Sequence, residues 1–587
     1  MKDKKYPYHL IAPVTVLSIA FIEYRFAVSD QCIYIPIIRK ILDNSLYPGD
    51  YLFDQPSGKY TILLPIVAYL SKIFAMRWVF FMGHIVAIFV LSWAIYKLAF
   101  SFFKNRDVAC IALLLLCASR LQDQAIITHE SFFTLQPVAT PFCLLSLCFF
   151  IKERYTLAVA FNAIAFLIHP IAAAPCFLLL AVYLIFNSYR LGLRALLRMV
   201  GVFLLITSPV SVRAIISMGG GSHSFSFFRV ASAEWMKILY GRNTYAFPAL
   251  WNRGSWIHFL SIVALLVISM FLKIMYAGMD KRDRKALYIV IASLASLGMA
   301  HLFGSVVPIS LIFGLQMARG LYMLMYVAFI YAAYAVWAGY KSGRLSIDRG
   351  AAAVISAAAI ATGDPKLTIW GALTSVMLWL PARLPDNIFR SVVRAPGILM
   401  AGFVVYLSLK NSVFAVIICA PVILLAAAEL LKKMRVLGGR PVYRWALIYV
   451  LFIAVFVAKV HKDGLRIDLP HQKPADAWTQ IQYWTAENTP KEAVFIVPWN
   501  TQGFRNLSKR SIVGDNKDGA PGLFSESYDM EWARRRGQLQ SYEKLRDEDF
   551  TELAREYKAS FVITRRNQKL GFPKSYENSE LYVYRLP

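Results

Sequence analysis

Residues 77–106 read RWVFFMGHIVAIFVLSWAIYKLAFSFFKNR, an apolar run that is long enough to cross a bilayer and ends in a short basic gap. Apolar runs continue in this way to about residue 460, and almost every second gap between them is basic. Because Lys and Arg resist translocation, we expect the basic gaps on the cytoplasmic side and the others outside. The cations of the basic gaps are Lys2, Lys4 and Lys5; Lys104 and Arg106; Lys152 and Arg154; Arg190, Arg194 and Arg198; Lys281, Arg282, Arg284 and Lys285; Lys341, Arg344 and Arg349; Arg383, Arg390 and Arg394; and Lys432, Lys433, Arg435, Arg440 and Arg444.

The apolar runs predict a polytopic α-helical membrane protein with roughly 13–15 spans in residues 1–460. The first run, Tyr8 to Val28, lacks an A-x-A-like cleavage site, so we interpret it as a retained span that runs outward from a cytoplasmic N-terminus. By the alternation of charge, the polar tail 461–587 then lies outside, in the periplasm or the extracellular space. The expected location is therefore the cytoplasmic (inner) membrane, with multiple spans.

The composition excludes an ordinary soluble protein, because the 587 residues are 58% hydrophobic with a mean hydropathy of +0.51. The formal charge of +28 lies almost wholly in residues 1–460, where topology and anionic lipid explain it, so nucleic acid is not an expected partner. The seven cysteines form no disulfide framework and no CxxC motif, and no metal site is predicted. These residues identify no cofactor, and they neither require nor exclude a divalent cation.

Two large outer loops are expected, at residues 29–76 and 217–255. The first contains two amphipathic stretches, Cys32–Leu46 and Tyr60–Phe74, which we expect to lie as helices on the outer leaflet. The second is rich in glycine, aromatic residues and arginine.

The tail, residues 461–587, is expected to form a small extracytoplasmic α/β domain separate from residues 1–460. Strands that alternate with helices predict a sheet with some parallel pairing. Helices are predicted at Ala475–Glu487 and over most of Tyr528–Tyr557, and strands at Val494–Val497, Ser511–Val513, Ser560–Thr564 and Leu581–Tyr584.

Two carboxylates in the first outer loop are candidate site residues. Asp30 lies a few residues beyond the first span, where a carboxylate can act as a general base, although a helix-end residue that meets water is an equally ordinary interpretation. Asp50 closes the turn Tyr47-Pro-Gly-Asp, and is compatible both with a substrate contact and with a simple turn role.

The next outer gap is unusually charged for its length. It contains Arg120, Asp123, His129 and Glu130, which together offer acid, base and phosphate-pairing groups. The alternative is a solvated loop with a local ion pair.

Later outer segments add His169, Arg229, Arg242 and Arg319. Arginine pairs readily with a lipid-linked phosphate, and histidine can hydrogen-bond a phosphate or a sugar hydroxyl. Ordinary alternatives are a helix-end contact for His169 and interfacial or snorkelling roles for the arginines.

This layout resembles that of the GT-C-fold glycosyltransferases, which are integral membrane enzymes that use a polyprenyl-phosphate-linked sugar on the outer side. The shared features are a cytoplasmic N-terminus, an acidic residue at the start of a long first outer loop with two amphipathic helices, many further spans and an outer C-terminal domain. The segment Trp484–Pro498, WTAENTPKEAVFIVP, resembles the start of the outer α/β domain of bacterial members. The residues that follow, Gly503-Phe-Arg505, Ser508, Arg510 and Lys517, resemble the continuation of that domain.

The resemblance implies that Asp30 is the catalytic base and that Glu130 or Asp123 occupies a second acidic position. It implies membrane lipid, a polyprenyl-phosphate sugar donor and a saccharide, lipid or protein acceptor as partners. The first loop lacks the paired acidic residues of protein mannosyltransferases, and the tail lacks the Trp-Trp-Asp signature of oligosaccharyltransferases, so neither substrate is indicated. A glycolipid transporter or flippase, and a non-catalytic component of envelope polysaccharide assembly, remain alternatives. Transporters usually carry repeated halves and charges near mid-membrane, and neither is visible here.

Overall fold

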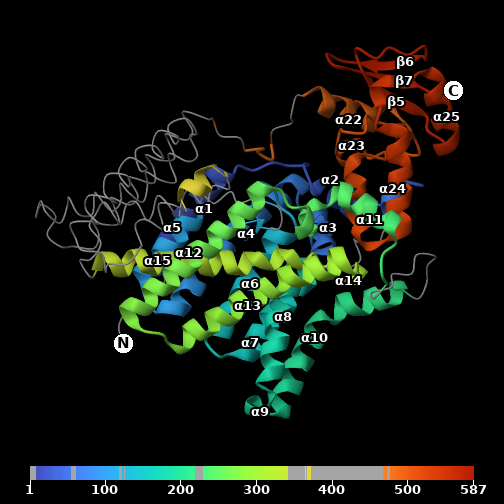
Figure 1. Cartoon of the computed structure of the whole chain (residues 1–587). Helices are drawn as coiled ribbons and strands as arrows, with labels where there is room; N and C mark the ends of the chain where they lie inside the picture. The colour runs from blue at the N-terminus through green and yellow to red at the C-terminus, as the bar shows by residue number, and fades with distance from the viewer. Residues whose placement is uncertain are drawn as a thin grey trace, which may run out of the picture.

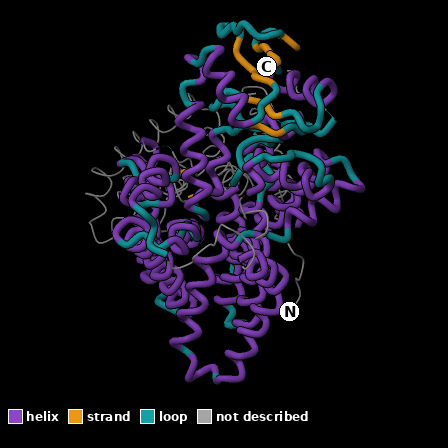
Figure 2. Tube along the Cα trace, turned by 90° about the vertical axis from the view of Figure 1, so that its right-hand side faces the viewer, coloured by secondary structure: helices purple, strands orange, loops and turns teal. Residues whose placement is uncertain are grey.

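The computed structural model describes residues 8–54, 61–117, 122–123, 126–127, 129–218, 229–341, 364, 366–371, 464, 467–471 and 476–587. A helical body forms most of this structure, and a small domain that contains the five-stranded sheet lies at one end of it (Figure 1). Figure 2 shows this separation, with the strands gathered near the C-terminus.

The helical body confirms a multi-pass membrane protein. Within the described residues, five helical segments are long and apolar enough to cross a membrane: Met76–Phe103, Leu193–Arg213, Arg253–Met275, Lys281–Val306 and Met317–Ala338. Shorter apolar helices accompany them. The predicted spans beyond residue 349 lie almost wholly outside the described residues, so the total span count stays a prediction.

The helices of the body are α1 (Tyr8–Ile22), α2 (Gln31–Leu42), α3 (Leu63–Ile73), α4 (Met76–Phe103), α5 (Arg106–Cys117), α6 (Leu135–Ile151), α7 (Tyr155–Ile168), α8 (Pro170–Phe186), α9 (Ser188–Leu191), α10 (Leu193–Met218), α11 (Ala233–Arg242), α12 (Arg253–Ala277), α13 (Lys281–His301), α14 (Ser310–Gly314) and α15 (Leu321–Lys341).

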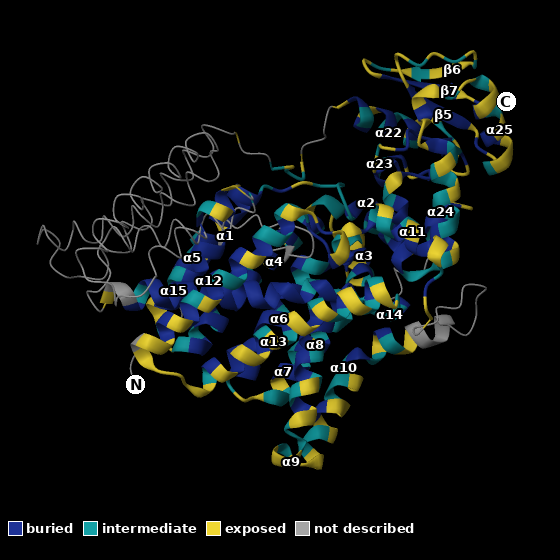
Figure 3. Ribbon diagram, viewed as in Figure 1, coloured by how far each residue is buried: buried dark blue, intermediate teal, exposed yellow. Residues whose placement is uncertain are grey.

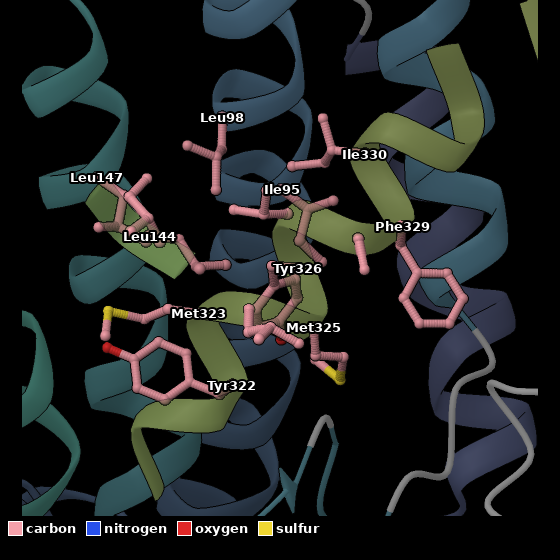
Figure 4. Packing of buried hydrophobic residues seen from close by; sticks show 14 of the residues in the cluster. Ile95, Leu98, Leu144, Leu147, Tyr322, Met323, Met325, Tyr326, Phe329 and Ile330 are labelled. Atoms are coloured by element: carbon pink, nitrogen blue, oxygen red, sulfur yellow. The ribbon is translucent and has the colours of Figure 1, made fainter. Parts of the chain in front are cut away.

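Helix α15 forms the centre of the body, and most of its length is buried (Figure 3). Figure 4 shows Tyr326 and Ile330 of α15 beside Ile95 of α4 and Leu144 of α6. Alanines interspersed along α15 allow neighbouring helices to approach closely. A tightly packed central helix gives a rigid position to the polar residues at its N-terminal end, where the single-turn helix η6 (Met317–Gly320) precedes it.

The loop that follows α1 contains two helices where they were expected, α2 and α3; that they lie on the outer leaflet stays a prediction. The first span is shorter than its apolar run suggests: α1 ends at Ile22, and the prediction that it continues to Val28 was wrong. The chain leaves the helix because Glu23 adopts a positive φ of 68° and Tyr24 pairs with Ile467 in a parallel bridge. Residues 23–30 therefore form an irregular connection that leads into α2.

The C-terminal domain has the predicted parallel pairing, and it adds antiparallel pairing at one side of the sheet. The strand order is β4-β3-β5-β7-β6, with β3 parallel to β4 and β5, and β7 antiparallel to β5 and β6. Strand β6 was not predicted, because its sequence KSYE is polar and lies at the sheet edge. The elements are α22 (Ala477–Asn488), β3 (Val494–Ile496), α23 (Phe504–Ser508), β4 (Ser511–Ile512), η7 (Asn516–Phe524), α24 (Glu526–Leu539), α25 (Asp547–Tyr557), β5 (Phe561–Arg565), β6 (Lys574–Glu577) and β7 (Leu581–Arg585).

Candidate functional site

The loop that follows α1 meets the C-terminal domain at a buried ion-pair cluster around Arg505, which is only 2% exposed. Arg505 donates from Nε and Nη2 to the two carboxylate oxygens of Asp50, at 2.7 and 2.8 Å. It also donates from Nη1 and Nη2 to the two oxygens of Asp518, at 2.7 and 2.9 Å. Burial opposes the Arg505 cation, but the two carboxylates outweigh it and hold the pKa of Arg505 above its usual range. We call these three residues the Arg505 anchor.

Asp50 is part of this anchor and is fully engaged in it. Besides Arg505, its oxygens accept the backbone N–H groups of Leu52 and Ile512, each at 3.0 Å. The contact with Leu52 is the turn role considered from the sequence. Asp50 therefore joins the loop that follows α1 to the C-terminal domain, and the substrate contact that we also considered stays a prediction.

The anchor fixes the start of η7, and with it Lys517. The Asp515 side chain accepts the backbone N–H groups of Lys517 and Asp518, at 2.8 and 3.1 Å, while Asp515 N donates to Asp518 Oδ2 at 3.0 Å. Arg242 of α11 donates from Nη2 to the Lys517 carbonyl oxygen at 3.5 Å. The backbone of Lys517 is therefore held from both the C-terminal domain and the second outer loop.

Lys517 meets Asp30 across this junction. Its Nζ lies 2.5 Å from Asp30 Oδ1, with the two side chains 19% and 45% exposed, respectively. Asp30 occupies the N-cap position of α2 and its side chain is 45% exposed, which agrees with the helix-end interpretation, but it makes no side-chain capping bond. Burial raises the pKa of the Asp30 carboxyl, but Lys517, followed by Arg319 and His169, outweighs it and brings this pKa below its usual value.

The backbone that presents Asp30 is strained. Ala27 and Ser29 have positive φ values of 65° and 53°, a conformation that costs of order 1–3 kcal/mol for residues other than glycine. The buried side chain of Gln31 stabilises this backbone conformation, because Gln31 Oε1 accepts a hydrogen bond from the Ala27 N–H at 2.6 Å and Gln31 Nε2 donates one to the Phe133 carbonyl at 3.0 Å. Gln31 thereby links the irregular connection of residues 23–30, which contains Asp30, to the segment that contains Glu130.

Glu130 is a second carboxylate in this region, and it is buried. Its Oε2 accepts a hydrogen bond of 2.6 Å from Thr134 Oγ1. Burial raises the pKa of Glu130 to about 7, the Thr134 bond opposes that rise, and the charge of Asp30 adds to it. Two neighbouring carboxylates with pKa values pushed in opposite directions are typical of an acid–base site.

Arg319 supplies a cation from η6, immediately before α15. Its Nε donates to Gln316 Oε1 at 2.6 Å, its Nη1 donates to Gln136, and its guanidinium lies 5.7 Å from the centroid of the Tyr245 ring. Gln316 itself has a left-handed backbone, with φ 49°. These contacts hold Arg319 where its charge acts on both Asp30 and Glu130.

His169 lies between α7 and α8. Burial, followed by the charge of Arg319, lowers the pKa of His169 to about 3, and Asp30 opposes this shift. The imidazole is therefore neutral at physiological pH and can act as a hydrogen-bonding group but not as a cation.

The remaining predicted site residues are distributed around this centre. Arg229 pairs with Glu526 Oε2 of α24 at 2.9 Å, which ties the second outer loop to the C-terminal domain. His129 is buried next to Glu130. Asp123 lies in the short strand Gln122–Asp123, but its side chain is outside the described structure, as is all of Arg120.

Sequence reasoning missed the direct partners of these residues. Tyr34 follows Asp30 by one turn of α2, and its pKa rises well above the usual value through burial, then through Asp30 and Glu130. That spacing was the only local signal for Tyr34. Gln136 had no such signal. Gln316 was noted only beside Arg319, Tyr245 only among the aromatic residues of the second large loop, and Lys517 only as part of the domain. Within the described residues, no group of three or more His, Cys, Asp and Glu side chains could hold a metal ion.

Comparison with known proteins gives a family model for part of the tail and several solved structures. Residues 476–539 match DUF6798, a domain of unknown function. No curated protein matches the chain. The chain is similar to the apo structure of ArnT from Cupriavidus metallidurans, at 14% identity and TM-score 0.49, over 98% of this chain and 97% of that one.

Two further solved structures are named as transferases. The apo oligosaccharyltransferase of Archaeoglobus fulgidus shares 12% identity at TM-score 0.42, over 96% of this chain and 70% of that one. Arabinofuranosyltransferase AftD from Mycobacteria shares 11% identity at TM-score 0.45, over 98% of this chain and 39% of that one. These values describe a likeness in architecture and assign no activity to this chain.

Proposed function

We propose that the protein is a membrane glycosyltransferase that moves a sugar from a polyprenyl-phosphate carrier to an acceptor at the outer face of the cytoplasmic membrane. The observation that carries the proposal is the juxtaposition of Asp30 and Glu130 with the cations Arg319 and Lys517. Such a set can serve a proton transfer and a phosphate leaving group at one place. The donor's polyprenyl tail would lie among the membrane helices, and the acceptor is a saccharide, a lipid or a protein.

In the proposed reaction, the acceptor hydroxyl oxygen attacks the anomeric carbon of the donor sugar. The bond between that carbon and the phosphate oxygen breaks, and its electron pair leaves with the polyprenyl phosphate. The hydroxyl proton passes to Asp30, with Glu130 as the second acidic group. Arg319 and Lys517 stabilise the negative charge that grows on the phosphate. A single displacement of this kind inverts the configuration at the sugar carbon.

The test is transfer of sugar from a panel of polyprenyl-phosphate sugars by the purified, reconstituted protein. Asp30→Asn keeps the size of the side chain and removes its charge, and should lower transfer by about 100-fold or more. Folding should survive, because the Asp30 side chain is 45% exposed. Absence of transfer by the wild type, across the panel of donors and acceptors, would refute the proposal.

Asp43→Asn is a matched control for this variant. Asp43 is the C-cap of α2, at the opposite end of the helix from Asp30, and also pairs with a lysine of the C-terminal domain: its Oδ2 lies 3.6 Å from Lys491 Nζ. The control should retain full transfer, so a loss seen only in Asp30→Asn reports the site and not the general charge of the junction.

The proposed orientation has its own test. With the N-terminus in the cytoplasm and the tail outside, a cysteine introduced at the exposed Ser541 should react with a membrane-impermeant thiol reagent in intact cells. Reaction only after permeabilisation would reverse the topology.

A further inference from the structure

The resting contact between Asp30 and Lys517 presents a difficulty for a base, because a carboxylate that holds an ammonium group is poorly placed to accept a proton. We infer that Lys517 couples donor binding to release of the base: the phosphate of the donor takes the Lys517 ammonium from Asp30, and Asp30 becomes free for the acceptor's proton only when the donor is present. This inference rests on the proposed function.

The contact is built to exchange. Within the described part of the chain, Lys517 Nζ makes one hydrogen bond, to Asp30 Oδ1 at 2.5 Å, although an ammonium group carries three donors. Asp30 is nearly half exposed, so a ligand can approach the pair from its side. A partly exposed single contact is weak enough for a competing anion to replace it.

Only the Lys517 side chain has to move. Its backbone N–H is held by Asp515, its carbonyl by Arg242, and the next residue, Asp518, by Arg505. A flexible four-carbon chain can redirect the ammonium by changing rotamers while this backbone stays in place. The exchange therefore requires no movement of the C-terminal domain.

The surrounding charges favour a phosphate as the competing anion. Arg319, in η6, also acts on Asp30, so a phosphate that binds near Lys517 and Arg319 would gain two cations where the Asp30 carboxylate loses one. Negative charge on the phosphate grows as the sugar leaves, which strengthens its hold on Lys517 in the transition state. Three titratable groups face Asp30, namely Lys517, Arg319 and His169. Lys517 in turn faces Asp30 and Arg242. Cys32, Tyr34 and Glu130 are the other titratable groups nearby.

Release changes the chemistry of Asp30. While Lys517 is paired with it, the pKa of Asp30 lies below its usual value, which makes it a weak base. Loss of the ammonium raises that pKa and so raises the proton affinity of the carboxylate. The base thus gains strength when the donor is bound.

The first arm of the test measures binding of farnesyl phosphate, a short polyprenyl phosphate, to the full-length protein in detergent. Lys517→Met should weaken binding about tenfold or more, as expected for loss of one charge-assisted hydrogen bond. Asp30→Asn should tighten binding by about threefold or more, because the competing carboxylate is neutralised while the cation remains. Lys491→Met, which removes the lysine of the exposed pair with Asp43, is the control and should bind like the wild type.

The second arm is the pH profile of transfer. The acid limb of kcat/KM reports the free enzyme, and in Lys517→Met it should move up by about one pH unit. The acid limb of kcat reports the donor complex, where Lys517 has already left Asp30, and it should stay in place. A purely structural role for Lys517 would lower activity without separating the two limbs.

The two proposals fail separately. If Asp30→Asn binds farnesyl phosphate no more tightly than the wild type, the coupling is overturned, even where the wild type transfers sugar. If the wild type transfers no sugar but Asp30→Asn still binds more tightly, the phosphate site stands and the glycosyltransferase assignment falls.

Discussion

Of the ion-pair regions that connect residues 29–54 to the C-terminal domain, two differ sharply in burial and geometry. In the Arg505 anchor, all three side chains are at most 2% exposed, and each carboxylate accepts two hydrogen bonds from Arg505. In the Asp30–Lys517 pair, one hydrogen bond joins partly exposed side chains. A buried pair of bidentate contacts fixes a position, whereas a single exposed contact can exchange partners. The Arg505 anchor therefore fixes the position of the site, and the Asp30–Lys517 pair can change partners during a reaction.

The largest effect is expected from Arg505→Met. The variant leaves the Asp50 and Asp518 carboxylates buried without a cation, which costs about 3–5 kcal/mol of unfolding free energy. Thermal unfolding and limited proteolysis should show earlier loss of the C-terminal domain. Arg534→Met is the matched control: Arg534 also binds two carboxylates, of Glu531 and Glu556, but is 50% exposed, so its loss should cost about 1 kcal/mol or less. Equal stability loss in the two variants would contradict the distinction between the regions.

The next largest effect should follow from Gln31→Met, which tests how the exchangeable pair is presented. The variant keeps the side-chain length but leaves the Ala27 N–H and the Phe133 carbonyl without their partner, at about 1–3 kcal/mol for each buried group. The connection should relax from its positive φ angles, and Asp30 should lose its position. Transfer should fall more than tenfold while binding of the isolated donor changes less, since Lys517 stays anchored. Unchanged transfer would show that Asp30 needs no such support.

Local patterns predicted most of the fold. The apolar runs near 77–101, 134–151, 155–168 and 256–276 predicted α4, α6, α7 and α12 to within a few residues, because an apolar helix is a property of one continuous segment. The amphipathic stretches for α2 and α3 were found for the same reason. The end of α1 was missed because a bridge from Tyr24 to Ile467, far along the chain, competes with the helix.

The site was predictable in residue type but not in pairing. Asp30, Glu130 and Arg319 could be nominated because each is a charged residue at the outer end of an apolar run. Their partners could not, since Lys517 is separated from Asp30 by 487 positions and Arg505 from Asp50 by 455. No periodicity spans such distances, and only the folded chain shows that Asp50 stabilises the junction while Asp30 faces an exchangeable lysine.

A smaller effect is expected from Asp529→Asn, which probes a buried acid of α24 where the domain meets α11. Asp529 is 1% exposed, and burial raises its pKa to about 7, with Arg242 opposing the shift. A folded-state pKa above the unfolded value means that the wild type loses stability as the pH rises toward and through 7. Asparagine imitates the neutral form, so the variant should be about 1–2 kcal/mol more stable than the wild type at pH 8 and nearly equal at pH 4.

Thermal unfolding of both proteins at the two pH values measures this difference. The comparison cancels the contributions of Glu130 and Asp515, whose pKa values burial also raises to about 7, because both proteins contain them. If the variant is less stable than the wild type at pH 8, the ionised Asp529 carboxylate is stabilised by Arg242, and the prediction is wrong.

The smallest effect is expected from the third ion pair between the loop and the domain, Asp43 with Lys491. The side chains are 46% and 57% exposed and lie 3.6 Å apart, so water and salt screen their attraction. Lys491→Met should change the unfolding free energy by less than about 0.5 kcal/mol and leave transfer intact. The Asp30–Lys517 pair links the same two parts of the molecule, so the contrast isolates what Lys517 does beyond holding them together. Loss of transfer in Lys491→Met would mean that activity depends on the summed charge across the junction, and the special role of Lys517 would then have no basis.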